Sequence, residues 1–452
     1  MTVFQLRRWG RTTLPLIVMI AVVLLALPPA NATTLVHCGQ SITSSIVLAN
    51  NLGCSSGDGL DVGKANITID LNGHRLDGAG ASNNGIDNVG FARVVIRNGV
   101  VANFGNWGVH LSGASRNKIT GLVVTGSGDV GINLEATSTH NKVSGNTVTG
   151  NGGNGIRFID SSNRNTASGN TADNNGDNGV SIENSSSNNT VSHNETNGNV
   201  NHGIRVENGA NFNTFSHNVS NSNGQNGISI VSSTNNTVTH NTTDGENKGI
   251  RIEDTSTYNK VAHNVASENS DTGIFVKNLS SNNTISHNTT NANANHGISL
   301  EGSSNNNVIA KNTVKGNGDG IRLTNSANNN TISRNVVTGN GCDGIDVNTS
   351  ANTNTVKRNI ASRNSCHGIG FTSTANNNIV TSNTADDNSL DGIFSDTNLV
   401  TINKNIADRN GFPNGVSNGN YGLTAPPGTP GSHNVARGNA NPGECTPSTL
   451  CA

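Results

Sequence analysis

The sequence predicts an all-β fold, a single-stranded right-handed parallel β-helix of about 14 rungs, each one coil of 22–24 residues. Three observations predict it: a Gly followed by Ile or Val recurs at that period, apolar residues alternate after it, and Asn recurs at two fixed offsets. The recurring glycines are Gly85, Gly108, Gly131, Gly155, Gly179, Gly203, Gly227, Gly249, Gly273, Gly297, Gly320, Gly344, Gly368 and Gly392.

The alternation after each Gly indicates a short strand with one buried face, as in Ile204 and Val206. Units this short can bury that face only by stacking on copies of themselves. The stacked strands then run parallel, and parallel crossovers are almost always right-handed. The chain is therefore predicted to form a solenoid, although its polar composition alone would suggest disorder.

The two Asn columns include Asn189 and Asn213 in the first and Asn194 and Asn218 in the second. Asn tolerates the left-handed backbone that tight corners need. Identical amides on successive rungs can also hydrogen-bond as ladders. We therefore expect these columns to be structural.

Four segments follow along the chain. Residues 1–32 resemble a signal peptide, with Arg7 and Arg8 before an apolar run and cleavage expected near Ala32. Residues 33–84 are predicted to cap one end of the coil, residues 85–410 to form the repeats, and residues 411–452 to form the other cap or tail. The chain is therefore expected to be secreted, periplasmic or at the cell surface, with no membrane span.

Six cysteines in an exported chain favour disulfides. We predict the pairs Cys38–Cys54, Cys342–Cys366 and Cys445–Cys451. The middle pair lies one repeat apart, and rungs stacked about 4.8 Å apart bring its Cα atoms into disulfide range.

The charge balance limits the partners. The net charge is −2 and the sequence pI is about 6.7, so no overall basic field exists and nucleic acid is not expected as a partner. The oligomeric state is left open.

The Gly-Ile rungs with paired Asn corners resemble right-handed parallel β-helix repeat proteins, a group with the pectate-lyase-like fold. Its members include NosD-type periplasmic proteins and carbohydrate-binding and sugar-hydrolase β-helix proteins. The stretch from Ile67 to His74 also resembles the first segment of bacterial members. The resemblance implies the fold over nearly the whole chain after the signal segment. It leaves the activity open, because structural positions carry it.

A histidine column is the first candidate site. Five histidines, each directly before an Asn of the second column, fall on consecutive rungs and could share a divalent metal such as Zn(II), Cu(II) or Ni(II). They are His193, His217, His240, His263 and His287. Because the column continues as Lys311, Arg334, Arg358 and Lys404, an exposed cationic stripe is the favoured interpretation.

The outward face of the strand after each Gly is the second candidate. Glu183 and Glu207 occupy the same position on adjacent rungs, with Arg205 beside them, and could act as a catalytic pair. An ordinary ion-pair pattern is the alternative. The residues expected to bind along the same face are Arg157, Arg251, Glu253 and Arg322.

Two weaker signals lie near these positions. Asp319, Asp343 and Asp346 offer carboxylates for Ca²⁺, but they supply fewer oxygens than calcium takes, so a turn role is favoured. Phe275 and Phe394 interrupt an otherwise polar column.

Three functions are compatible with this sequence. The favoured one is a non-catalytic exported β-helix that presents a polar face to carbohydrate or cell-surface material. The alternative is a polysaccharide lyase or glycoside hydrolase that uses the Arg/Glu face. NosD-like copper handling is third, and the scarcity of soft ligands weakens it.

Overall fold

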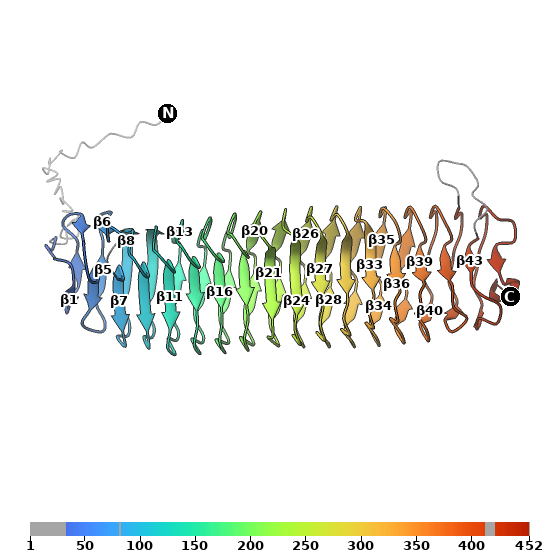
Figure 1. The fold of residues 1–452 in the computed structure, drawn as a ribbon, viewed down its shortest axis with the longest axis horizontal. Coiled ribbons are helices and arrows are strands. Elements are labelled where there is room, and N and C mark those ends of the chain that lie inside the picture. Colours follow the sequence, from blue (N-terminus) through green and yellow to red (C-terminus); the bar gives the residue numbers. More distant parts are fainter. Residues whose placement is uncertain (1–32, 81–82, 412–420, 452) are drawn as a thin grey trace, which may run out of the picture.

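The computed structural model describes residues 33–80, 83–411 and 421–451. Over these ranges the chain forms one elongated right-handed coil of short parallel strands, from β1 (Gln40–Ile42) to β45 (Cys445–Thr446) (Figure 1). The predicted all-β class and parallel stacking are confirmed. The signal segment predicted at 1–32 lies outside the described residues. In the part of the chain that is described, no helix combines the length and apolarity needed to cross a membrane.

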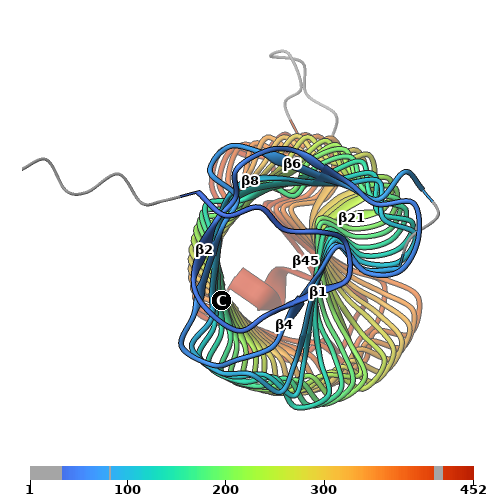
Figure 2. The ribbon, with the colours of Figure 1, turned by 90° about the vertical axis from the view of Figure 1, so that its left-hand side faces the viewer.

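The strands form three parallel sheets along the coil, and the view along the axis shows successive rungs stacked over one another, with β2 and β4 on different sides (Figure 2). Sheet 1 contains β1, β4 (Leu60–Val62), β7 (Ile86–Val89), β9 (Val109–Ser112), β11 (Ile132–Glu135), β14 (Ile156–Phe158), β16 (Val180–Ile182), β18 (Ile204–Val206), β21 (Asn226–Val231), β24 (Lys248–Glu253), β27 (Thr272–Val276), β30 (His296–Leu300), β33 (Asp319–Leu323), β36 (Ile345–Val347), β39 (Ile369–Phe371), β41 (Ile393–Ser395), β43 (Leu423–Thr424) and β45.

Sheets 2 and 3 form the remaining sides of the coil. Sheet 2 contains β2 (Ile46–Val47), β3 (Leu52–Gly53), β5 (Thr68–Asp70), β6 (Arg75–Asp77), β8 (Val95–Ala102), β10 (Lys118–Thr125), β12 (Lys142–Ser144), β13 (Thr147–Thr149), β15 (Thr166–Ser168), β17 (Thr190–Ser192), β19 (Thr214–Ser216), β22 (Thr237–Thr239), β25 (Lys260–Ala262), β28 (Thr284–Ser286), β31 (Val308–Ala310), β34 (Thr331–Ser333), β37 (Thr355–Lys357), β40 (Ile379–Thr381), β42 (Thr401–Asn403) and β44 (Gly431–Ser432). Sheet 3 contains β20 (Val219–Asn221), β23 (Thr242–Asp244), β26 (Val265–Ser267), β29 (Thr289–Asn291), β32 (Thr313–Lys315), β35 (Val336–Thr338) and β38 (Ile360–Ser362).

The stack is longer than predicted. Sheet 1 has 18 strands within the described residues, against the 14 rungs expected. The segments predicted as caps are themselves part of the coil, since Leu60 pairs with Ile86 and Leu423 pairs with Ile393. The additional rungs Gly59-Leu60 and Gly422-Leu423 were missed because Leu takes the inward position that Ile or Val fills elsewhere.

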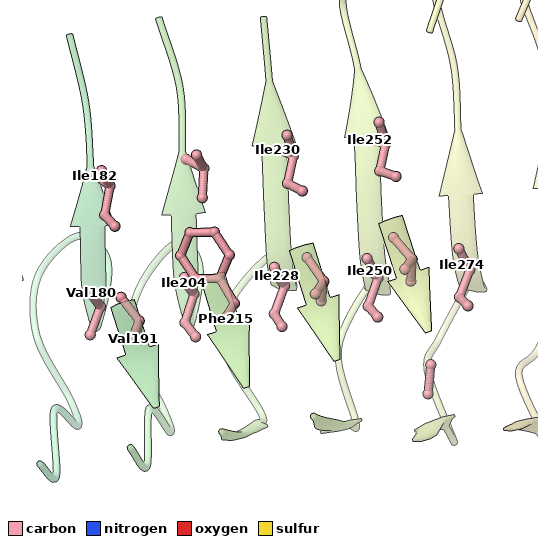
Figure 3. Packing of buried hydrophobic residues seen from close by; sticks show 14 of the residues in the cluster. Val180, Ile182, Val191, Ile204, Phe215, Ile228, Ile230, Ile250, Ile252 and Ile274 are labelled. Carbon is pink, nitrogen blue, oxygen red and sulfur yellow. The ribbon is translucent and has the colours of Figure 1, made fainter. Parts of the chain in front are cut away.

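The core runs the length of the coil and is filled by inward side chains of facing sheets. Ile204 and Ile228 of sheet 1 and Val191 and Phe215 of sheet 2 are all fully buried (Figure 3). Burying a side chain of this size contributes about 1.5–3 kcal/mol. The β-branched residues suit both the strands and the narrow interior.

The recurring Gly is required by the close approach of the next rung. A Cβ on Gly155 would lie 2.6 Å from the carbonyl oxygen of Gly179 and 2.7 Å from Nδ2 of Asn175. Any larger residue would force the rungs apart, which explains the strict period.

The Asn columns form buried ladders, as predicted, and a third ladder runs beside them. In the second column, the backbone N–H and Nδ2 of Asn194 both donate to Oδ1 of Asn218, each at 3.0 Å. Nδ2 also donates to the carbonyl oxygen of Ala167 at 3.0 Å. The third ladder makes the same contacts, for example from Asn175 to Asn199. Most of the buried amides in these ladders thus have their partners, as buried polar groups require, and the side-chain nitrogens of Asn117 and Asn354 are exceptions.

The three predicted disulfides are present, Cys38–Cys54, Cys342–Cys366 and Cys445–Cys451. The Cα atoms of Cys342 and Cys366 are 4.5 Å apart, because the two residues stack on adjacent rungs.

Candidate functional site on the charged face of sheet 1

The outward side chains of sheet 1 form rows of mostly charged and polar groups, which we call the charged face. The register aligns one position per rung along it. That row reads Arg157, Ser181, Arg205, Ser229, Arg251, Phe275, Ser299, Arg322 and Asp346. A second row, two residues further along each strand, includes Glu183, Glu207, Glu253 and Glu301.

The predicted catalytic trio is held in local hydrogen bonds. Arg205 Nη2 donates to Glu207 at 2.5 Å, and Ser181 Oγ donates to Glu183 at 2.5 Å. Burial raises the pKa of Glu183, although the Ser181 hydrogen bond and nearby Arg157 oppose the shift. Both carboxylates are therefore engaged by their own rung, which favours the ion-pair interpretation over a free catalytic pair.

His202 is a member of this group that sequence reasoning missed. Its Nε2 lies 2.8 Å from Arg205 Nη1, and the residue is 1% exposed. Burial, together with Arg205 and Arg251, lowers the pKa of His202 to about 3. The imidazole is therefore neutral at ordinary pH and accepts a hydrogen bond from the guanidinium.

A pocket of about 370 Å³ opens in the middle of the charged face. It is lined by Lys248, Arg251, Asp271, Thr272, Phe275, Lys277, Asn295, His296 and Glu301. The ammonium of Lys248 lies 2.6 Å from Asp271 and 5.2 Å from the centre of the Phe275 ring, and that of Lys277 lies 5.9 Å from the same ring. Arg251 pairs with Glu253 beside it. The pocket therefore presents donors, acceptors and an aromatic floor together.

A group of acidic residues lies at the C-terminal end of this face. Arg322 Nε is 3.6 Å from Asp346, and Arg322 Nη1 is 3.1 Å from Nε2 of His296. Burial raises the pKa of Asp346 to about 7, with nearby Asp343 and Asp319 adding to the shift. Burial likewise raises the pKa of Asp343 to about 6. Carboxyls whose pKa is raised by burial beside an Arg and a His make this group a candidate functional site.

Carboxylates also gather at the N-terminal end. Asp87 lies 2.6 Å from Nδ1 of His110, whose Nε2 is 3.2 Å from Glu135. Burial, with Asp58 and Asp87 nearby, raises the pKa of Asp61. The charged face is thus acidic at both ends and mixed in the middle.

The histidine column takes the form of a stacked stripe. Neighbouring rings lie 4.8–5.0 Å apart with planes within 17° of parallel. Ring nitrogens point along the ring plane, so parallel faces do not direct two lone pairs at an ion between them. Over the described ranges, three potential ligands converge only at Cys342, Asp343 and Cys366, and at Asp58, Asp61 and Asp87.

These two groups differ from the candidate metal ligands of the sequence, for which a cationic stripe and a turn role were the favoured interpretations. Neither contains a member of the histidine column, and neither is the set of Asp319, Asp343 and Asp346. All six cysteines are disulfide-bonded, so no thiol is available as a soft copper ligand in the described residues.

The comparisons with known proteins identify the architecture. A family model described as a right handed beta helix region matches residues 38–218, 195–337 and 317–443. No curated protein matches the sequence. The periplasmic alginate epimerase AlgG is 13% identical, with 77% of each chain covered and a TM-score of 0.41. The Dettilon tailspike protein is 13% identical over 76% of this chain and 62% of that chain, with a TM-score of 0.42. The A-module of the Azotobacter vinelandii mannuronan C-5 epimerase AlgE4 is 16% identical over 67% and 86%, with a TM-score of 0.38.

Proposed function

This chain belongs to the family of right-handed β-helix proteins, and on that premise we propose that it is an exported protein that binds a polysaccharide along the charged face of sheet 1. The pocket around Phe275 is the observation that supports this most directly. A concave site with an apolar floor and a few convergent polar groups is the usual form of a ligand site.

The chemistry of the pocket suits a sugar. Phe275 is 6% exposed and lies under Lys248 and Lys277, whose flexible stems can move to admit a pyranose ring. Asn295 and Glu301 offer acceptors for hydroxyl groups, and Arg251 offers a planar donor. Because the face continues over many rungs, it suits a polymer better than a single sugar.

Export is supported by the three disulfides, which persist in oxidising compartments. The basic and apolar start of the sequence is in keeping with this.

Calorimetric titration with a panel of neutral and acidic polysaccharides tests the binding function. Lys277→Met should weaken binding about tenfold, since a charged hydrogen bond contributes about 1.5–3 kcal/mol. Lys315→Met on sheet 3 is the matched control, because Lys315 is exposed and outside the pocket. Equal affinities for both variants and the parent protein would place the ligand elsewhere.

A polysaccharide-active enzyme, lyase or hydrolase, is the second candidate, and the raised pKa values of Asp343 and Asp346 favour it. A carboxyl that titrates near 7 can take or give a proton at working pH. Arg322 would neutralise a sugar carboxylate beside it. We therefore place this alternative at Asp346 rather than at the predicted Glu183 and Glu207.

The assay for this alternative measures new reducing ends and unsaturated products from the same panel. Loss of product in Asp346→Asn, with product retained in Glu207→Gln, would establish the enzyme and its centre. If the parent protein binds the polymer but forms no product, the enzyme alternative is excluded and the binding function remains.

A further inference from the structure

A second surface, on the outward side of sheet 2, differs sharply from the charged face. It comprises the outward side chains from β10 to β42 and the two corners that bracket these strands, and we call it the basic face. Its cations are Arg116, Lys118, His140, Lys142, Arg164, His193, His217, His240, Lys260, His263, His287, Lys311, Arg334, Lys357, Arg358 and Lys404. In these columns of the described rungs no position holds Asp or Glu.

The basic face carries unpaired charge. On the charged face Arg205, Lys248, Arg251 and Arg322 each pair with a carboxylate. Among the described residues, none of the cations on the basic face forms an ion pair. The cations of the basic face are thus separated from the carboxylates. They create a local positive field that cannot be seen from the net charge of −2.

The charges are also regularly spaced. The corner that holds the five histidines has a left-handed backbone, with φ between 56° and 59°. This corner stacks their rings 4.8–5.0 Å apart in a row along the axis. Lys311, Arg334 and Arg358 continue the row at the same corner. From His193 to Arg358 the result is one imidazole or permanent cation per rung.

Hydroxyl groups lie beside that row, and two aromatic rings lie at the other corner of the basic face. Thr166, Thr190, Thr214 and Thr237 are in register on successive strands and half-exposed. At the opposite corner Phe212 is 58% exposed and Tyr258 is 62% exposed. A hydroxyl floor between cations and aromatic rings matches the hydroxyls, carboxylates and apolar ring faces of an acidic sugar.

We propose that the basic face binds a linear acidic polysaccharide, a polyuronate laid along the axis of the coil with a carboxylate beside each rung. A uronate chain carries one carboxylate per sugar, so a chain laid along the axis brings a series of carboxylates to the row of cations. Duplex nucleic acid fits less well, because its phosphates advance by about 3.4 Å per strand. This site is separate from the one in the proposed function and uses none of its residues.

Binding at the basic face depends on pH because five of its central side chains are imidazoles, which carry a positive charge only when they are protonated. A slight desolvation, with Lys311, His263 and Lys260 nearby, lowers the pKa of His287. The carboxylate nearest along the chain is exposed Glu195, two residues beyond His193 around the corner. A bound polyanion favours the protonated rings, so affinity rises as the pH falls.

Titration of the full protein with polygalacturonate, at about pH 5.5 and about pH 8, tests the proposal, since imidazoles change charge between these values. We expect binding about tenfold tighter at the lower pH, because several exposed ion pairs each add a small factor. The carboxyl-reduced form of the same polymer is the control ligand and should not bind here. A pH-independent affinity, or equal binding of the reduced polymer, would overturn the proposal.

Two variants separate charge from structure. The triple change His217→Asn, His240→Asn and His263→Asn should abolish the gain at low pH, and Asn tolerates this backbone. The matched triple change to Lys, which the same corner already holds at Lys311, should keep tight binding at about pH 8, where Lys stays charged. No gain from the Lys triple would contradict the proposal.

Two further comparisons identify the ligand and the surface. Single-stranded oligodeoxynucleotides are the second test ligand. If they bind the protein and polygalacturonate does not, the ligand is nucleic acid and the assignment to a polyuronate is refuted. Lys315→Met, at an exposed position of sheet 3 outside both faces, should leave the pH-dependent binding unchanged. Lys277→Met tests the charged face and the histidine variants test the basic face, so failure at one face is distinguishable from failure at the other.

Discussion

Glu246 takes the place of an Asn in the third ladder and receives the hydrogen bonds of Asn223 on the preceding rung. Its Oε2 accepts from the Asn223 backbone N–H at 2.8 Å, and its Oε1 accepts from Asn223 Nδ2 at 2.9 Å. The Glu246 backbone N–H donates to Oδ1 of Asn269, so the ladder continues through it. The residue is 1% exposed and therefore places a carboxyl inside a row of neutral amides.

Glu246→Gln should stabilise the protein at alkaline pH. Burial raises the pKa of Glu246 to about 7, although hydrogen bonds from Asn223 and Ser220 oppose the shift. The unfolded chain ionises near 4.5, so the stability associated with this group is full below that pH and is lost as the pH rises to 7. The loss is about 3 kcal/mol.

Denaturant midpoints at about pH 4.5 and about pH 8 measure this effect, because the group changes charge between them. The variant should match the parent at the lower pH and exceed it at the higher one. Glu195→Gln, at an exposed position, should change neither value. A variant that is less stable at both pH values would contradict this account.

Asn264→Ala should be strongly destabilising. It removes the acceptor of Asn241, whose backbone N–H and Nδ2 donate to Asn264 Oδ1 at 2.9 and 3.0 Å. Each buried donor left unpaired costs about 1–3 kcal/mol. Thr239→Ala, a half-exposed position two residues before Asn241, should shift the unfolding midpoint little. Similar midpoints for the two variants would mean that the ladder is dispensable.

Two glycines with different constraints should respond differently to Ala. Gly155→Ala places a Cβ 2.6 Å from the Gly179 carbonyl oxygen and should cost more than about 2 kcal/mol. Gly169 has a φ of 62° with open space around it, so Ala there should cost about 1–2 kcal/mol, for backbone strain alone. Gly169→Asn should be almost neutral in thermal unfolding. The reverse order of effects would show that contact between rungs does not fix the Gly column.

The repeat made the fold predictable because each structural requirement recurs on every rung. The recurring Gly marks the position where the backbone of the next rung comes close. The alternation seen in Ile204 and Val206 marks the buried face of the strand. The terminal rungs were missed where Leu60 and Leu423 replace Ile or Val. Pairing of Cys342 with Cys366 followed from the period alone.

The site was less accessible to sequence reasoning. His202 and His296 directly precede their glycines, at a position where Asn, Lys, Thr and Asp also occur, so no periodic signal marks them. Whether they lie over the charged face depends on how the corner bends before the strand. The difference in charge between sheets 1 and 2 does not appear in the net charge, which is near zero. It becomes visible only when the strand register shows which columns lack carboxylates.

Asp346→Asn should stabilise the protein near pH 8 and impair its function. Burial raises the pKa of Asp346 from 3.8 to about 7, so its ionised form is costly in the fold beside Asp343 and Asp319. The free energy of unfolding depends on pH in the same direction as for Glu246, because the stability associated with Asp346 is lost as the pH rises from 3.8 to 7. The amide keeps an acceptor for Asn348 Nδ2, which donates to Asp346 at 2.5 Å. We expect a gain of roughly 2–4 kcal/mol near pH 8 and little change near pH 4.

Unfolding midpoints and polysaccharide titrations on the same Asp346→Asn preparation show whether the gain and the loss occur together. A charge that destabilises the fold is retained when a ligand or a proton transfer uses it. Greater stability with weaker binding or lost turnover would therefore assign Asp346 to the site. Greater stability with unchanged function would make the acidic group a structural feature of the coil and leave the Phe275 pocket as the centre of the charged face.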